Sequence, residues 1–318
     1  MRRRNLLSKK NKFANEYLTF EVIENGSINF SGSTTANTLS YSLDGGTTWT
    51  TPRSSISFST HSGDKILWKG SGMSPQFESG IGIFTTSSGK FNIEGNFMSL
   101  YYGDNFKGEL NLSGKTAAFR CLFKGNTSLI SLEKAILPAM TLPQDCYREM
   151  FSGCTSLTTV NKGLLPSDEI PVRGCYNMFQ LCSSLRNMPD LPATTLGNYA
   201  YCGMFLSCTN LEDTTEVLPA TTLSFQCYCW MFQGCQKIVT APAILAPKLE
   251  SESCRSMFPY CFSLNRITCL ATDISAYNCT KNWVISVGGN GTFIKAPSMT
   301  SWTSGNDGIP NGWTVQDA

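Results

Sequence analysis

The stretch Met150-Phe151-Ser152-Gly153-Cys154-Thr155-Ser156-Leu157 recurs along this chain and sets its organisation. Similar copies begin at Met178, Met204, Met231 and Met257, and an earlier copy begins at Leu122. The phenylalanine of each copy is separated from the next by 26 to 28 residues, and the six are Phe123, Phe151, Phe179, Phe205, Phe232 and Phe258. A period of this size indicates supersecondary units stacked into a solenoid.

Within one unit, apolar residues follow each other in steps of four, as at Leu142, Cys146, Met150 and Cys154. Steps of four place side chains on one face of a helix. After this segment comes a short β-prone piece, and then Leu-Pro-Ala-Thr-Thr-Leu, which is complete at 191–196 and 218–223. Proline disfavours helix just before it, and threonine suits a helix N-cap. The pattern therefore predicts a strand, a proline turn and a helix in each repeat of a leucine-rich-repeat solenoid over residues 101–284, and an α+β fold for the chain.

The chain has 14 cysteines, and five of them occupy one position, three residues after the repeat phenylalanine. These five are Cys154, Cys182, Cys208, Cys235 and Cys261. Cysteines spaced by the repeat period are expected to form a ladder of small buried residues with free thiols. Disulfides between rungs about 5 Å apart are the alternative. Cys227-Tyr228-Cys229 is a lone CxC, so the sequence predicts no metal site and no cofactor.

Residues 16–100 read as short strands with turns between them, which predicts an all-β, sandwich-like domain. Asn25-Gly26 lies between two β-prone runs and predicts a hairpin turn. Further on, four residues match the Asp-box pattern of sialidase propeller blades: Ser42, Asp44, Gly46 and Trp49. The pattern occurs once, whereas a propeller needs several copies. We therefore expect a structural turn held by the Ser and Asp side chains, with Trp49 packed beneath it.

The C-terminal residues 285–318 are expected to be a β cap that closes the stack, as a hairpin or a pair of strands. Val284 stands 26 residues after Phe258, as a degenerate seventh repeat position. Trp302 and Trp313 are expected to cover the last repeat. Stacking of these two rings on a sugar is the alternative.

The first 15 residues form a basic arm that begins the chain. Six of the 25 basic residues lie among the first twelve, which leaves 19 basic against 23 acidic residues for the remainder. The body is therefore not expected to bind nucleic acid, while the arm is either a disordered tail or a contact for an acidic partner. No apolar run of membrane-spanning length and no secretion signal is recognisable. We therefore expect either that the protein leaves the cell by a route that does not use a leader of its own, or that a leader has been removed.

No catalytic constellation is recognisable in the sequence. His61, the one histidine, is expected in an exposed loop without a paired nucleophile. Phosphate-binding loops, HExxH and EF-hand motifs are absent. We therefore expect a protein that is not an enzyme.

The recurring Met-Phe-x-x-Cys-x-x-Leu unit resembles BspA-type leucine-rich repeats, whose pattern runs Ala-Phe-x-x-Cys-x-x-Leu. Methionine replaces the usual alanine, and the added Leu-Pro-Ala-Thr-Thr-Leu resembles a subtype of gut Bacteroidales and their phages. The resemblance covers about 180 residues and implies adhesion or virion architecture without catalysis. We expect a phage virion component, such as a fibre, decoration or tail-associated protein, oligomeric in its assembly and exposed on the virion surface.

In this interpretation the arm and the β-domain contact other virion proteins, and the solenoid projects towards a host glycan or protein. The second hypothesis is a bacterial cell-surface adhesin that binds host glycoprotein or polysaccharide.

Overall fold

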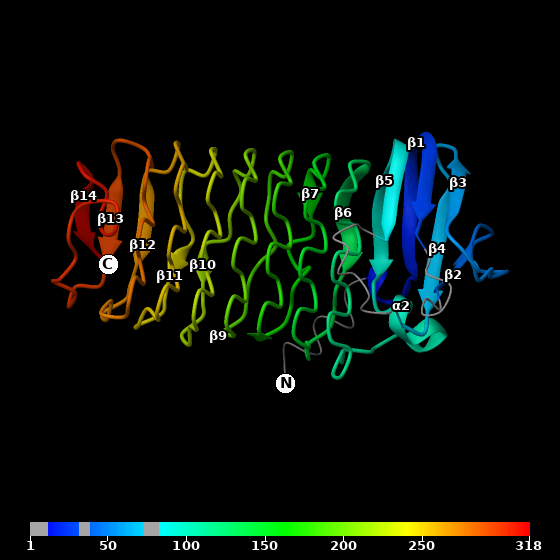
Figure 1. Ribbon diagram of the computed structural model, residues 1–318, viewed down its shortest axis with the longest axis horizontal. Coiled ribbons are helices and arrows are strands. Elements are labelled where there is room, and N and C mark those ends of the chain that lie inside the picture. Colours follow the sequence, from blue (N-terminus) through cyan, green and yellow to red (C-terminus); the bar gives the residue numbers. More distant parts are fainter. Residues whose placement is uncertain (1–11, 32–38, 73–82) are drawn as a thin grey trace.

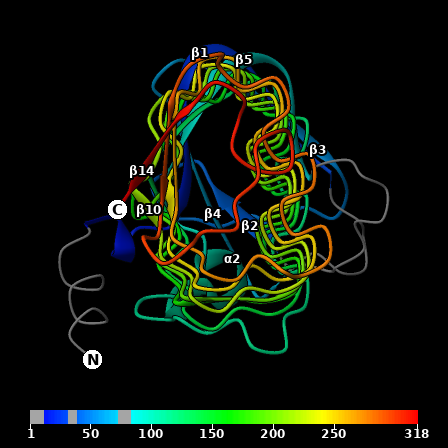
Figure 2. The ribbon, with the colours of Figure 1, turned by 90° about the vertical axis from the view of Figure 1, so that its left-hand side faces the viewer.

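The computed structural model describes residues 12–31, 39–72 and 83–318, which form an elongated stack of coils with a broad sheet at one end (Figure 1). The described chain is mostly β. Its one α-helix there is α2 (Ser99–Tyr102), which the 3₁₀ turn η3 (Gly103–Asn105) follows directly, and another 3₁₀ turn, η1 (Lys12–Asn15), precedes the strands. Figure 2 shows the coils end on, superimposed as one closed outline with a nearly straight wall that carries β10 and β14. Most of the predicted basic arm lies outside the described residues.

The N-terminal strands form one sheet that continues into the solenoid. Its order is β2-β4-β1-β5-β6-β7, and β3 also pairs with β1. The strands are β1 (Leu18–Phe30), β2 (Leu39–Ser42), β3 (Ile56–Thr60), β4 (Lys65–Gly70), β5 (Phe84–Asn96), β6 (Leu129–Ile136) and β7 (Thr159–Val160). Strand β5 pairs antiparallel with β1 on one side and parallel with β6 on the other.

The predicted sandwich is therefore not what residues 16–100 form, because their strands belong to a single sheet. Its buried face packs on the first coil instead of on a second sheet. The Phe20 ring lies 5.6 Å from the Phe123 ring, and the Phe84 ring lies 5.1 Å from it. The core of the sheet and the core of the solenoid are thus continuous.

The hairpin predicted at Asn25-Gly26 is wrong, because β1 runs straight through these residues. Gly26 meets the neighbouring strand at very close range: a Cβ built on it would lie 2.3 Å from the Ser88 carbonyl oxygen. The pairing of β1 with β5 shifts register at this point. The glycine thus serves a close backbone approach at an irregularity in the sheet, and not a turn.

Parallel strands continue along the C-terminal part of the stack. They are β10 (Val217–Leu218), β11 (Ala243–Ile244), β12 (Arg266–Cys269), β13 (Thr292–Lys295) and β14 (Thr314–Asp317), while β8 (Glu169–Ile170) and β9 (Thr195–Leu196) form a separate pair. The pairing of β13 with β14 is parallel, so of the two predicted alternatives the cap contains a pair of strands and not a hairpin.

The segment predicted to be a helix is instead a series of four-residue turns. Every fourth residue has a positive φ, as at Asp145 (58°), Glu149 (54°) and Gly153 (76°). The same three positions recur in seven coils, ending with Asn278, Asn282 and Ser286 around Val284. We call these segments the turn wall: residues 117–126, 145–154, 173–182, 199–208, 226–235, 252–261 and 278–287.

Hydrogen bonds explain why turns replace the helix. In the turn wall, N–H groups alternate between two kinds of partner: Phe151 donates to the Met178 carbonyl of the next coil (2.9 Å), and Met150 donates to the Tyr147 carbonyl three residues back (3.2 Å). A helix would use its N–H groups within one coil and leave none for the neighbours. A period of four also suits these turns better, because side chains in steps of four drift about 40° per step around a helix.

The repeat residues fill the interior as ladders. From Phe123 to Phe258, consecutive phenylalanine rings stack 5.5–5.8 Å apart and within 13° of parallel. Each of the five repeat cysteines donates its S–H to the carbonyl of the phenylalanine in the preceding coil, at 3.0–3.1 Å. Asn126, which replaces the cysteine in the first coil, donates from Nδ2 to the Phe84 carbonyl at 3.1 Å. The cysteine position is thus a buried hydrogen-bond donor that links coils.

A charged cluster fastens the sheet to the first coil. Glu94 on β5 is almost fully buried and accepts hydrogen bonds from Lys65 on β4 and Lys134 on β6, and Glu21 on β1 lies within 4 Å of both lysines. Burial alone would raise the pKa of the Glu94 carboxyl, but the hydrogen bonds from Lys134 and Lys65 outweigh burial and lower it. Four neighbouring strands are tied together by this cluster.

Candidate functional site

The predicted Asp-box residues form a self-contained turn between β2 and Thr50. Ser42 Oγ donates to Asp44 Oδ1 (2.7 Å) and accepts from the Gly46 N–H (2.8 Å). Asp44 also accepts from the Thr48 N–H, which is the first cause of its pKa falling to about 2. Trp49 packs against Tyr17, with ring centroids 5.0 Å apart, and donates from Nε1 to the Gly46 carbonyl. All the polar groups named here hold the turn itself.

The two tryptophans of the C-terminal segment lie over the last coil. Trp302 stacks on Trp283 at 5.4 Å and 3° between planes, and the Trp283 ring lies 6.2 Å from the Phe258 ring. Trp313 is buried and donates from Nε1 to the Gly288 carbonyl. Both rings are engaged in packing. The Trp302 Nε1 is buried, with no hydrogen-bond partner among the described residues.

The fourteen cysteines all have free thiols and are all buried. Burial is the first cause that raises the pKa of Cys227, Cys261 and Cys269, to about 12 each. Thiols held neutral in this way are poor nucleophiles. Among the described residues, no cluster of three or more His, Cys, Asp or Glu side chains is arranged to hold a metal ion.

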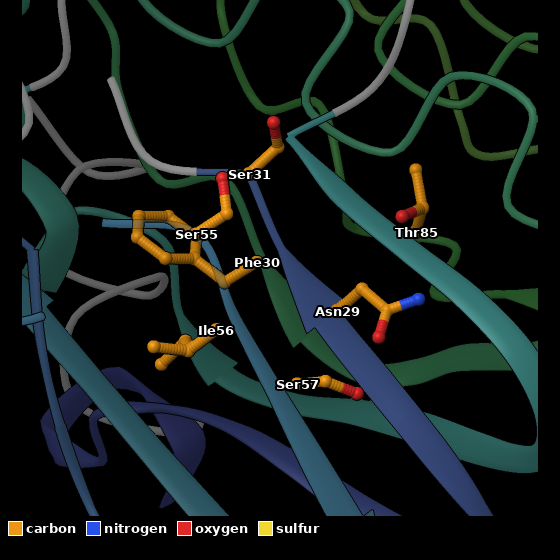
Figure 3. Close-up of a pocket in the computed structure, with 7 residues that line it drawn as sticks. All are labelled: Asn29, Phe30, Ser31, Ser55, Ile56, Ser57 and Thr85. Atoms are coloured by element: carbon orange, nitrogen blue, oxygen red, sulfur yellow. The ribbon is translucent and has the colours of Figure 1, made fainter. Parts of the chain in front are cut away.

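His61 lies in an exposed loop, with 78% of its side chain accessible, and its nearest acidic partner is Asp64. A shallow hollow of about 370 Å³ lies on the N-terminal sheet, lined by Asn29, Phe30, Ser31, Ser55, Ile56, Ser57 and Thr85 (Figure 3). Ser57, Asn29 and Thr85 face one another across β3, β1 and β5. Hydroxyl and amide groups line this hollow, and it contains no titratable side chain.

The outward face of the turn wall divides into a charged part and an uncharged part. Charged side chains lie on the first two coils and again on the last two. Asp145 accepts from Arg173 at 2.7 and 3.0 Å, and Glu149 pairs with Lys124 and with Arg148. Arg173 and Lys124 thus join three successive coils through ion pairs.

The uncharged part covers the next three coils. Residues 173–182, 199–208 and 226–235 contain one charged residue, Arg173, which is the partner of Asp145. We call five of its partly exposed outward side chains the neutral patch: Tyr176, Asn177, Gln180, Trp230 and Gln233. Between them lies Gly203, where a Cβ would be 2.1 Å from the Asn177 amide oxygen.

Cys202 and Cys229 occupy the position of Tyr176 in the next two coils, and the thiols of both are buried. The Cys229 thiol is the first cause that raises the pKa of Cys202, followed by burial. Burial, and then the Cys202 thiol, raises the pKa of Tyr176. The guanidinium of Arg148 lies 5.3 Å from the Tyr176 ring and borders the patch.

The repeat motif does not include the residues of the neutral patch. The repeat motif directs attention to residues that point inward, whereas Tyr176 and Trp230 lie between them at positions that vary from coil to coil. One signal was present in the sequence: three consecutive turn segments that share a single charge. That signal gains meaning only when the turn geometry shows which residues face outward.

No helix among the described residues combines the length and apolar character that crossing a membrane requires. Comparison of the chain with protein families, curated proteins and solved structures gave no match.

Proposed function

We propose that this chain is a non-enzymatic structural and adhesion protein, and that it serves as a surface component of a phage virion. The N-terminal arm and sheet attach it to the particle, and the stacked coils project for contact with a host surface. The resemblance of its repeats to BspA-type adhesins supports the adhesive role.

The observation that carries this proposal is the ladder of free, buried thiols. Fourteen cysteines without a disulfide suit a protein that folds in a reducing compartment. A virion component assembles in the bacterial cytoplasm and leaves by lysis, so it needs neither oxidation nor an export signal. A solenoid whose coils share one core also suits a projecting rod, because each added coil extends the same surface.

Mass spectrometry of purified phage particles tests the proposal. We expect the chain among the virion proteins at a stoichiometry set by the symmetry of the particle. Its presence in the outer membrane fraction of uninfected bacteria, and its absence from particles, would support the second hypothesis, a bacterial cell-surface adhesin.

Thiol titration of the denatured, unreduced protein separates the same two hypotheses. Nearly complete recovery of free thiol favours cytoplasmic assembly. Recovery of disulfides favours an exported adhesin, because exported proteins meet an oxidising environment.

A further inference from the structure

The neutral patch combines exposure with a lack of charge. A surface that meets water usually carries charged side chains, and the first two coils of the turn wall do so with Arg148, Glu149 and Lys124. The next three coils have aromatic or amide groups at five of the nine corresponding positions, and Cys202, Gly203, Leu206 and Cys229 at the other four. Rings beside uncharged donors and acceptors are suited to ligands that have both apolar faces and hydroxyl groups.

Several polar groups of the patch have unused hydrogen-bonding capacity. The Tyr176 hydroxyl, the Asn177 and Gln233 amides and the Trp230 Nε1 form no side-chain hydrogen bond with any described part of the chain. Gln180 accepts one long bond of 3.5 Å from Ser152. Donors and acceptors are therefore available to a ligand without breaking an internal bond.

Trp230 occupies a backbone position that does not favour it. Its φ is 56°, and the equivalent residue of the preceding coil is Gly203. The turns of the wall require this left-handed conformation at every fourth residue, so it belongs to the fold, and a bulky side chain there costs conformational free energy relative to glycine. The partly exposed indole of Trp230 makes no ring stacking contact with another described aromatic residue. The indole ring is therefore not used for stacking within the described chain.

We infer that the neutral patch binds a neutral carbohydrate chain, with the Trp230 ring stacking on a sugar face and the Asn177 and Gln233 amides hydrogen-bonding its hydroxyls. This inference rests on the adhesive role proposed above and places it on the turn wall of the third to fifth coils. An anionic chain is disfavoured because the cations at the patch are already paired: Arg173 with Asp145, and Arg148 with Asp145 and Glu149.

The test uses the full chain with soluble dextran, mannan and galactomannan as neutral probes, and hyaluronan and heparin as anionic probes. Calorimetry and intrinsic tryptophan fluorescence measure binding. We expect at least one neutral probe to bind and both anionic probes to fail. Trp230→Gly should weaken that binding roughly tenfold or more, because an exposed aromatic anchor contributes disproportionately to affinity.

Trp230→Gly also controls for misfolding. Glycine accepts a φ of 56° without strain, as at Gly203, so the melting temperature should not fall. A loss of binding with unchanged melting cannot be attributed to unfolding. As a matched aromatic control, Trp49→Ala lies in the N-terminal part and should leave the affinity unchanged.

Any of these probe results would overturn the inference: no neutral probe binds, an anionic probe binds more tightly, or Trp230→Gly binds as well as the parent chain. None of these results bears on the proposed virion role, which mass spectrometry of purified particles tests separately. Capture of a host protein at this patch without any carbohydrate binding would likewise overturn it.

Discussion

The N-terminal sheet and the turn wall both bury phenylalanine, but they arrange the rings differently. In the sheet, aromatic pairs meet edge-on or tilted, as for Phe20 and Phe84 at 82° and for Tyr41 and Phe58 at 83°. In the turn wall the repeat rings lie within 13° of parallel. Isolated pairs prefer edge-to-face or offset packing. The parallel stack therefore follows from the translation of nearly identical coils, which gives every ring the orientation of the ring before it.

The two regions also differ in their thiols, because all fourteen cysteines lie between Cys121 and Cys279. Burial raises the pKa of Cys227, Cys261 and Cys269, so the contribution of these thiols to folding is fully present below the unfolded thiol pKa of about 8.5 and is lost as pH rises towards the folded values. Three thiols with a folded pKa of about 12 would together cost about 4 kcal/mol for each pH unit above that point.

We therefore expect the unfolding free energy to collapse between about pH 8.5 and pH 10. Urea unfolding across this range, with thiolate absorbance recorded in parallel, measures it. Thiolate that appears before unfolding, or stability that persists through this range, would contradict neutral buried thiols.

Truncating one ring of the phenylalanine stack tests how much the stack contributes to the unfolding free energy. Phe205 is fully buried between Phe179 and Phe232, each 5.7 Å away. Phe205→Ala should lower the unfolding free energy by about 3–5 kcal/mol, because a cavity remains inside a rigid stack. The matched variant Phe205→Leu should cost about 1.5 kcal/mol or less if its core repacks. Equal costs for the two variants would indicate that stacking, rather than volume, determines stability here.

The charged cluster at the junction tests how much the ion pairs between sheet and solenoid contribute to the unfolding free energy. Glu94→Gln removes the charge that Lys65 and Lys134 share and should cost about 1–3 kcal/mol near neutral pH. Because the folded pKa of Glu94 is lowered, its contribution is present above the unfolded value of about 4.3 and is lost as pH falls through the folded value.

The stability difference between parent and Glu94→Gln should therefore shrink below about pH 4. Denaturant titrations at neutral and acidic pH measure it. A difference that is independent of pH would assign the effect to packing.

One substitution by glycine should change the unfolding free energy in opposite directions for the turn wall and for the predicted helix. Ser207 has a φ of 61° at the position that Gly153 and Gly234 occupy in other coils. Ser207→Gly should raise the unfolding free energy by about 0.5–1 kcal/mol by relieving left-handed strain. In a helix the same change would lower stability by a similar amount. Thermal melting of the two chains gives the answer.

Much of the core could be predicted from the repeat alone. The frame of the six phenylalanines, the shared cysteine position and the seventh unit at Val284 all recur in the structure as equivalent positions of successive coils. The N-terminal sheet was harder to predict, since Asn25-Gly26 has the composition of a turn. The role of Gly26 became clear only from its proximity to Ser88, which is distant in sequence.

The sequence by itself determined which residues face inward, because a strict spacing of four gives one apolar face in a helix and in a series of turns alike. The tertiary structure decided between the two. Each coil offers alternate N–H groups to the next, as Phe151 does to Met178, and this satisfaction of backbone groups between coils requires a left-handed residue at every fourth position. The same geometry brings Asn177, Gly203 and Trp230 into one outward row, which no local pattern indicates.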